Sequence, residues 1–217
     1  MSATSTVITD AHFAYIAERT QRDDAFLTDL KREAAARDIP AIWISPEQAS
    51  FMQVLLMAAK AREVVEVGTL AGYSAISMAR ALPPGGRVRT IEIEPKHADF
   101  AESWVRRSEV ADRVEVHRGD GREVLRGFAS DSADAAFIDA DKPGYETYLR
   151  ESLRIVRRGG LVLVDNALAF GHVLDQASDD ASVRAIQAVN EVIAREPRLR
   201  GVLVPIGDGL WVCVRTQ

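Results

Sequence analysis

The segment EVVEVGTLAGYS, residues 63–74, decides the fold. A short β-branched run leads into a turn with two glycines, and a helix-like stretch follows. Four more runs of this kind occur along the chain, namely RVRTIEI (87–93), RVEVHR (113–118), AAFID (135–139) and GLVLVD (160–165). Each run precedes a turn signal and a helix-like segment. This alternation predicts βαβ units and a parallel sheet.

The C-terminal end departs from the alternation. The runs VLVPI (202–206) and LWVCVR (210–215) are separated only by Gly207-Asp208-Gly209. Such a connection is too short for a parallel crossover and suits a hairpin. We therefore predict an α/β fold with a Rossmann-like, doubly wound, mostly parallel sheet of about seven strands, an antiparallel last strand and helices on both faces.

The N-terminal region has a helical pattern. We predict helix throughout residues 9–60, with Asp10 able to cap one segment and Ser45-Pro46-Glu47-Gln48 starting another. The length of 217 residues suits one domain. We expect a single domain over 1–217, in which residues 1–60 form a helical cover and 61–217 form the Rossmann-like core.

Composition narrows the class of protein. The net charge is -5, and Lys and Arg are scattered rather than gathered in a basic run, so nucleic acid is not an expected partner. No apolar stretch approaches the roughly 20 residues that span a bilayer, and the N-terminus resembles no signal peptide. We expect a cytoplasmic protein without a membrane partner. The only cysteine, Cys213, is expected in a strand interior.

The first glycine turn favours S-adenosylmethionine (SAM) over NAD. A dinucleotide fingerprint needs glycine where Leu70 stands, and the acidic Glu66 would repel phosphate but suits the ammonium of an amino acid. Glu92 lies about 20 residues beyond Gly72, where an acidic side chain can accept hydrogen bonds from ribose hydroxyls. Gly119-Asp120-Gly121 is equally compatible with a turn facing adenine and with the start of a helix.

Oxygen-bearing side chains follow the fourth and fifth expected strands. Asp139 and Asp141 follow one, and Asp165 and Asn166 follow the other. Any one of them could be a cap or a turn residue. As a set without Cys or His they match a hard cation, Mg²⁺ first, with Mn²⁺ or Ca²⁺ as alternatives. Lys142 is a candidate general base, since an ammonium beside a divalent cation loses its proton more readily.

The motifs VVEVGTLAGYSA, TIEIE, FIDADKPGYETY and LVLVDNAL resemble, in order and spacing, those of cation-dependent O-methyltransferases such as caffeoyl-CoA and catechol O-methyltransferases. The resemblance runs from about Ile44 to the C-terminus. It implies that Asp139, Asp165 and Asn166 bind the metal and that Lys142 acts on the substrate hydroxyl. The residues that it implies for the SAM pocket are Ile44, Glu66, Gly68, Thr69, Ser74, Glu92, Gly121, Asp139, Asp141 and Tyr148.

The chain departs from the family pattern after the Asp-Asn pair. Many members have Thr-Leu-Trp there, whereas this chain has Ala167-Leu168-Ala169-Phe170, which removes a bulky ring from the expected substrate wall. The resemblance implies SAM-dependent methylation of a hydroxyl on a small, catechol-like phenol. It also implies N-terminal helices that cover the acceptor or form a homodimer interface. The alternatives are an NAD-dependent oxidoreductase and a non-catalytic nucleoside-binding dimeric module.

Overall fold

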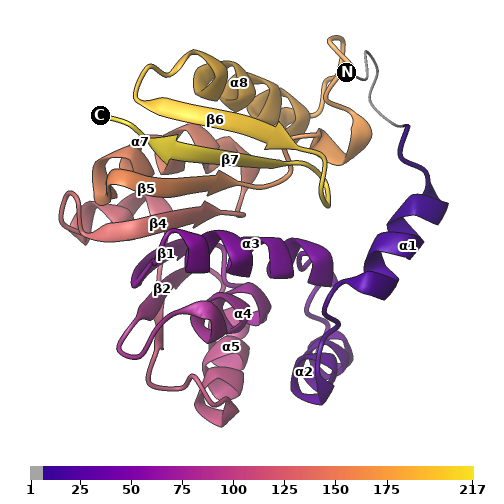
Figure 1. Cartoon of the computed structure of the whole chain (residues 1–217), viewed down its shortest axis with the longest axis vertical. Helices are drawn as coiled ribbons and strands as arrows, with labels where there is room; N and C mark the ends of the chain where they lie inside the picture. Colours follow the sequence, from indigo (N-terminus) through magenta and orange to yellow (C-terminus); the bar gives the residue numbers. More distant parts are fainter. Residues whose placement is uncertain (1–6) are drawn as a thin grey trace.

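The predicted sheet is present and has seven strands in the order β3-β2-β1-β4-β5-β7-β6 (Figure 1). A computed structural model describes residues 7–217 of the chain. The strands are β1 (Glu63–Val67), β2 (Arg87–Glu92), β3 (Val114–Arg118), β4 (Ala133–Ile138), β5 (Val156–Val164), β6 (Leu199–Val204) and β7 (Leu210–Arg215). All pairings from β3 to β5 are parallel, and β7 is antiparallel to both β5 and β6. The α/β prediction, including the reversed last strand, is confirmed.

The strand order reverses between β1 and β4. The chain moves outward from β1 through β2 to β3, and then crosses back to place β4 on the other side of β1. The connections after β1 and β4 therefore leave in opposite directions and open a crevice at the carboxyl ends of these two strands. Ligands bind at this point in open parallel sheets.

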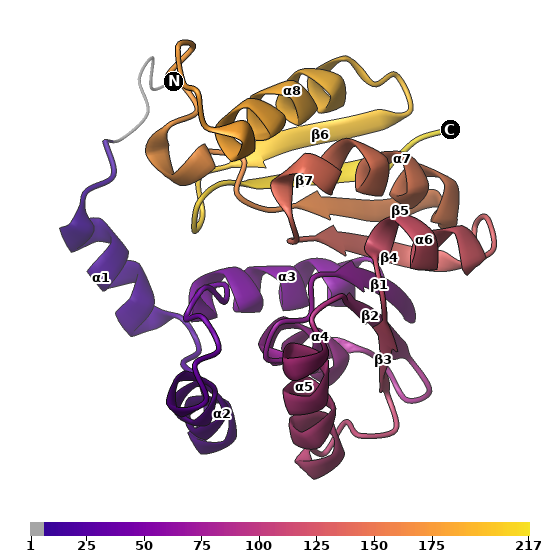
Figure 2. The ribbon, with the colours of Figure 1, turned by 180° about the vertical axis from the view of Figure 1, so that it is seen from behind.

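Helices cover both faces of the sheet, as Figures 1 and 2 show from opposite sides. Successive side chains along each central strand point to opposite faces of the sheet and so belong alternately to two apolar clusters, one on each face. The first cluster includes α3 (Pro46–Ala58), α4 (Tyr73–Ala81) and α5 (Pro95–Arg107), and the second includes α7 (Tyr145–Ile155) and α8 (Ala181–Arg195). Shorter elements are α6 (Gly121–Val124), η1 (Leu125–Gly127), η2 (Lys142–Gly144) and η3 (Ala169–Gly171).

The N-terminal region is helical in three pieces, so the prediction of continuous helix over 9–60 is wrong in its detail. Besides α3, it forms α1 (Asp10–Arg19) and α2 (Ala25–Ala36), with non-helical segments between them. Asp10 is the first residue of α1 rather than its cap, because Thr9 takes that position and pairs with His12. The break after α2 precedes Pro40, which disfavours helix at the residue before it.

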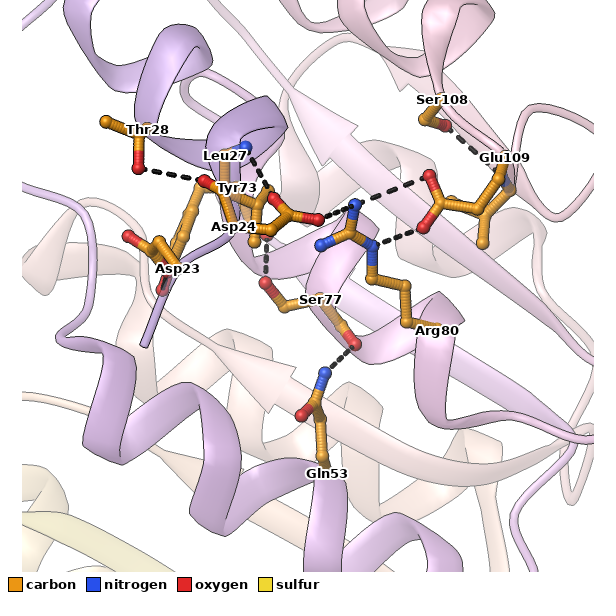
Figure 3. Close-up of polar contacts among 11 residues, drawn as sticks. Asp23, Asp24, Leu27, Thr28, Gln53, Tyr73, Ser77, Arg80, Ser108 and Glu109 are labelled. Atoms are coloured by element: carbon orange, nitrogen blue, oxygen red, sulfur yellow. Dashed lines mark hydrogen bonds and ion pairs between the residues drawn. The ribbon is translucent and has the colours of Figure 1, made fainter. Parts of the chain in front are cut away.

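An ion pair and a hydrogen bond attach the start of α2 to α4 (Figure 3). Arg80 of α4 contacts Asp24 at 3.1 Å and Glu109, beyond the end of α5, at 2.6 Å. Asp23 also accepts a hydrogen bond from the Tyr73 hydroxyl at 2.7 Å. In contrast, α1 has no buried residue and extends away from the sheet (Figures 1 and 2). Residues 1–6, which belong to the helical cover predicted over residues 1–60, lie outside the described part of the chain.

Cys213 is buried within β7, as expected. None of the helices in the described part of the chain is long and apolar enough to cross a bilayer.

Candidate functional site

A cavity of about 510 Å³ opens at the carboxyl ends of the central strands. Its walls include the turn after β1, the segment from Ile42 to Ile44, the loop after β4, and Phe170. The size lies within the range that proteins use for cofactors and small ligands. Every residue that the sequence predicted for the SAM pocket lines this cavity, with the exception of Glu66.

The turn after β1 depends on glycine at its first position. Gly68 has a φ of +101°, and a Cβ there would overlap the backbone carbonyl of Asp139. The missing side chain lets the turn pack directly on the loop after β4. Leu70 has a positive φ of 49°, and its backbone N–H donates to Glu92 Oε2 at 2.7 Å. Glu92 therefore stabilises the turn whose shape forms the cavity wall.

Glu92 has more partners than the sequence indicated. Its other oxygen, Oε1, accepts from the backbone N–H of Glu94 at 2.9 Å, and His97 Nδ1 lies 3.8 Å away. Two backbone donors thus fix the carboxylate at the edge of the cavity. The lone pairs left over can still accept from a ligand hydroxyl, so its role toward ribose stays a prediction.

Glu66 lies completely buried beneath the turn. Burial raises the pKa of its carboxyl to about 8, and the nearby hydroxyls of Ser74 and Thr90 oppose the rise only in part. The carboxyl is therefore mostly protonated at pH 7 in this structure. A cation close to Glu66 would favour the charged form and lower its pKa again.

The oxygen ligands predicted from two separate motifs do meet. Asp139 follows β4, and both Asp165 and Asn166 follow its neighbour β5. The parallel ladder extends one residue further, since Asp165 N–H donates to Ile138 O at 3.0 Å. Lys142 Nζ lies between the two loops, at 3.3 Å from Asp139 Oδ1 and 2.5 Å from Asn166 Oδ1.

These acidic groups are electrostatically unfavourable without a cation. Burial raises the pKa of Asp139, and the Lys142 ammonium opposes that rise. Burial and the neighbouring Asp139 raise the pKa of Asp165 to about 7. Within residues 7–217 no group of three His, Cys, Asp or Glu side chains is placed to hold a metal ion. The predicted ligand set is not a group of that kind, because its third member, Asn166, is an amide. The Lys142 ammonium contacts two of the three predicted ligands, Asp139 and Asn166, so the cluster accommodates positive charge. Hard oxygen donors of this kind fit Mg²⁺, Mn²⁺ or Ca²⁺.

Asp141 and Tyr148 also line the cavity and contact each other. The Tyr148 hydroxyl donates to Asp141 Oδ1, and burial together with this bond raises the pKa of the phenol. Nearby, the Asp120 side chain accepts from Arg122 N–H at 2.8 Å and caps α6. The helix-start interpretation of Gly119-Asp120-Gly121 is therefore confirmed. Both glycines also line the cavity, so the interpretation as a turn that faces adenine stays a prediction.

Three residues at the site were not predicted. Gln48 Nε2 donates to Asp165 Oδ1 at 2.7 Å, and the Tyr145 hydroxyl accepts from Lys142 Nζ at 2.7 Å. Phe170 lines the cavity, one position after the alanine that replaces the ring common in the family. The sequence placed Gln48 at a helix start but offered no signal of its partner. Tyr145 stands inside the motif FIDADKPGYETY, and Phe170 lies two residues after LVLVDNAL, so both could have been named.

Comparisons with known proteins identify the family of the chain. A family model described as O-methyltransferase matches residues 17–216. A catechol O-methyltransferase from Niastella koreensis is 37% identical over 182 residues, which cover 82% of each chain. A catechol O-methyltransferase from Mycobacterium tuberculosis is 38% identical over 190 residues, covering 87% of this chain and 86% of the relative.

A solved structure is also similar along nearly the whole chain. The O-methyltransferase from Bacillus cereus in complex with SAH has a TM-score of 0.87 and 35% identity, and the match covers 95% of this chain and 97% of that one. The residues matched by the family model include the whole cavity and its acidic edge. The chain therefore belongs to the O-methyltransferase family.

Proposed function

We propose that the enzyme transfers the methyl group of SAM to a hydroxyl of a small catechol-like phenol, and that it uses a divalent metal ion. The observation that carries this proposal is the convergence of Asp139, Asn166 and Lys142 at the edge of the cavity beside the glycine turn. Relatives that are named catechol O-methyltransferases support the acceptor class. The SAH in the Bacillus cereus structure is the demethylated form of SAM and supports the donor.

We assign the donor to the part of the cavity lined by the glycine turn, the loop after β4 and α7. Gly68, Thr69 and Ser74 line it at the turn and at the start of α4, and Asp141 and Tyr148 line it from the loop and from α7. The Glu92 carboxylate at the end of β2 is positioned to accept from ribose hydroxyls. The complete set of donor residues that we propose is Ile44, Glu66, Gly68, Thr69, Ser74, Glu92, Gly121, Asp139, Asp141 and Tyr148.

We assign the metal to Asp139, Asp165 and Asn166, with Mg²⁺ as the first choice. A bound ion of this kind would orient two vicinal oxygens and favour the deprotonated form of one of them. Lys142 reaches the same place and is our candidate for accepting the hydroxyl proton at Nζ. The Tyr145 hydroxyl fixes Lys142 by accepting one of its hydrogen bonds at 2.7 Å.

The acceptor would lie against aromatic side chains. Trp43 and Phe170 both line the cavity, on segments far apart in the sequence. Flat apolar walls of this kind suit a phenolic ring, whose hydroxyls can then face the acidic edge. In this arrangement the segment before α3 covers the acceptor, and the remaining catalytic groups come from residues 61–217.

We also propose that the enzyme is a homodimer in which α1 contributes to the interface. This helix has no buried residue, although it carries Phe13 and Ile16, which are 46% and 41% exposed. Exposed apolar side chains on a projecting helix suit contact with a second chain. The cytoplasmic location and the single-domain organisation of the chain stay predictions.

The assignment of separate donor and metal sites can be tested with Asp165→Ala. We expect methyl transfer to catechol to be abolished, while the Kd for SAM, measured by calorimetry without added metal, changes less than threefold. The reason is that Asp165 belongs to the acidic edge and is not among the residues that line the donor cavity. If SAM binding and turnover are lost together, the two sites are not separate.

A further inference from the structure

Gln48 is a buried amide whose partner is a predicted metal ligand. It is 1% exposed and lies in the first turn of α3, yet its Nε2 donates at 2.7 Å to Oδ1 of Asp165. The local sequence explains how the side chain reaches this place. Ser45 Oγ accepts from Gln48 N–H at 3.2 Å, and Pro46 occupies the first helical position, so the start of the helix is fixed.

The other end of the Gln48 amide is also confined. Gly207, in the loop between β6 and β7, approaches so closely that a Cβ there would overlap Gln48 Oε1. The amide is therefore packed between Asp165 on one side and the Gly207 backbone on the other. A side chain held at both ends has few rotamers available and loses little entropy when its partner binds a ligand.

We propose that Gln48 is a positioning residue for the metal site: it holds Asp165 Oδ1 and so directs the other carboxylate oxygen, Oδ2, toward the cation. This inference rests on the proposed metal-dependent function. Hydrogen bonds to the carboxylates that bind metals orient them and strengthen metal binding. A neutral amide suits this task because it donates a hydrogen bond without cancelling the negative charge that the cation needs.

The two carboxylates of the site are therefore held in different ways. Asp139 contacts the Lys142 ammonium, which a bound cation can displace, whereas Asp165 contacts a buried amide that Gly207 confines from the other side. Asp165 is the preorganised ligand of the pair. Gln48 also connects the metal site to the helix that follows the cavity-lining segment Ile42–Ile44.

The test measures Mn²⁺ affinity directly, by electron paramagnetic resonance of free Mn²⁺, in the full-length protein with and without SAM. In Gln48→Leu we expect the Kd for Mn²⁺ to rise about 10- to 100-fold, as is typical for the loss of a hydrogen bond to a metal ligand. The Kd for SAM without metal stays within about twofold of the wild-type value, because Gln48 does not line the donor cavity. Saturating Mn²⁺ then restores most of kcat.

Gln53→Leu is the matched control. Gln53 lies on the same helix and also donates an amide hydrogen bond at 2.7 Å, but to the backbone oxygen of Ser77 on α4 (Figure 3). The control should bind Mn²⁺ with wild-type affinity. Gln48→Asn keeps the amide but shortens its reach, and it carries the same expectation of weaker Mn²⁺ binding if Gln48→Leu does not fold.

The outcomes separate this inference from the function on which it rests. If wild-type protein binds Mn²⁺ and the Gln48 variants bind it equally well, Gln48 has no positioning role and the metal site stands. If wild-type protein binds SAM but no Mn²⁺, the proposed metal site fails and the role of Gln48 fails with it. Equal losses in Gln48→Leu and Gln53→Leu would assign the effect to α3 as a whole and overturn the specific role.

Discussion

Replacement of the buried Glu66 by glutamine should change how stability depends on pH. The Glu66 carboxyl has an ordinary pKa of 4.5, which burial raises to about 8 in the folded chain. Between these two values the unfolded chain has lost the proton and the folded chain still binds it. Folding is then linked to proton uptake, so stability falls as pH rises through this window and is least affected below pH 4.5.

The size of the effect follows from the two pKa values. Each pH unit within the window removes about 1.4 kcal/mol from the free energy of unfolding. From pH 5 to pH 8, Glu66 alone should therefore remove about 3 kcal/mol. Glutamine has a similar shape and no titrating proton, so Glu66→Gln should lack this contribution. Asp139 and Asp165 titrate in both proteins, so the comparison removes their contributions except for the charge interaction between Asp139 and Glu66.

Urea denaturation of both proteins at pH 5, 6, 7 and 8, without SAM or metal, measures the difference. We expect the stability of Glu66→Gln relative to wild type to increase by about 3 kcal/mol from pH 5 to pH 8. A stability difference that stays constant across this range would refute the reasoning, because it would mean that the pKa of Glu66 is the same in the folded and unfolded chains.

Three further substitutions test other parts of the site. Gly68→Ala should lower the free energy of unfolding, measured by urea denaturation, by roughly 2 kcal/mol or more. The new Cβ would overlap the Asp139 carbonyl at a residue whose φ is positive, so an unchanged stability would contradict the tight packing. Lys142→Met should reduce kcat about 10²- to 10⁴-fold with SAM affinity unchanged, the range typical of a general base, and a loss below tenfold would exclude that role. Phe170→Gly should raise the KM for catechol severalfold and leave the Kd for SAM unchanged, and an unchanged KM would remove Phe170 from the acceptor wall. Because Phe170 has a positive φ of 54°, glycine there should also add up to about 1 kcal/mol to the free energy of unfolding.

The sequence predicted the sheet well because its signals are local. Each β-branched run is followed by a turn signal, and Gly207-Asp208-Gly209 is short enough to require a hairpin. The start of β5 was missed, since Arg157, Arg158 and Gly159 lack the apolar pattern of a buried strand. These residues belong to the first part of β5, where its register with β4 shifts: Ala133 pairs with Val156, but Ala135 pairs with Leu161.

The site was predictable where it follows from topology. Asp139, Asp165 and Asn166 stand after neighbouring strands, and the carboxyl ends of parallel strands share one edge of the sheet. The contact between Gln48 and Asp165 could not be predicted, because the two residues are 117 positions apart. Only the packing of α3 against the sheet brings them together.

One rate measurement decides whether methyl transfer by this enzyme depends on a metal ion. Purified protein is incubated with methyl-labelled SAM and catechol, and the initial rate of label transfer is followed as Mg²⁺ is added to protein pretreated with EDTA. We expect no measurable transfer in EDTA and a rate that rises to saturation with Mg²⁺. Transfer to catechol at an equal rate in EDTA would contradict the metal site formed by Asp139, Asp165 and Asn166.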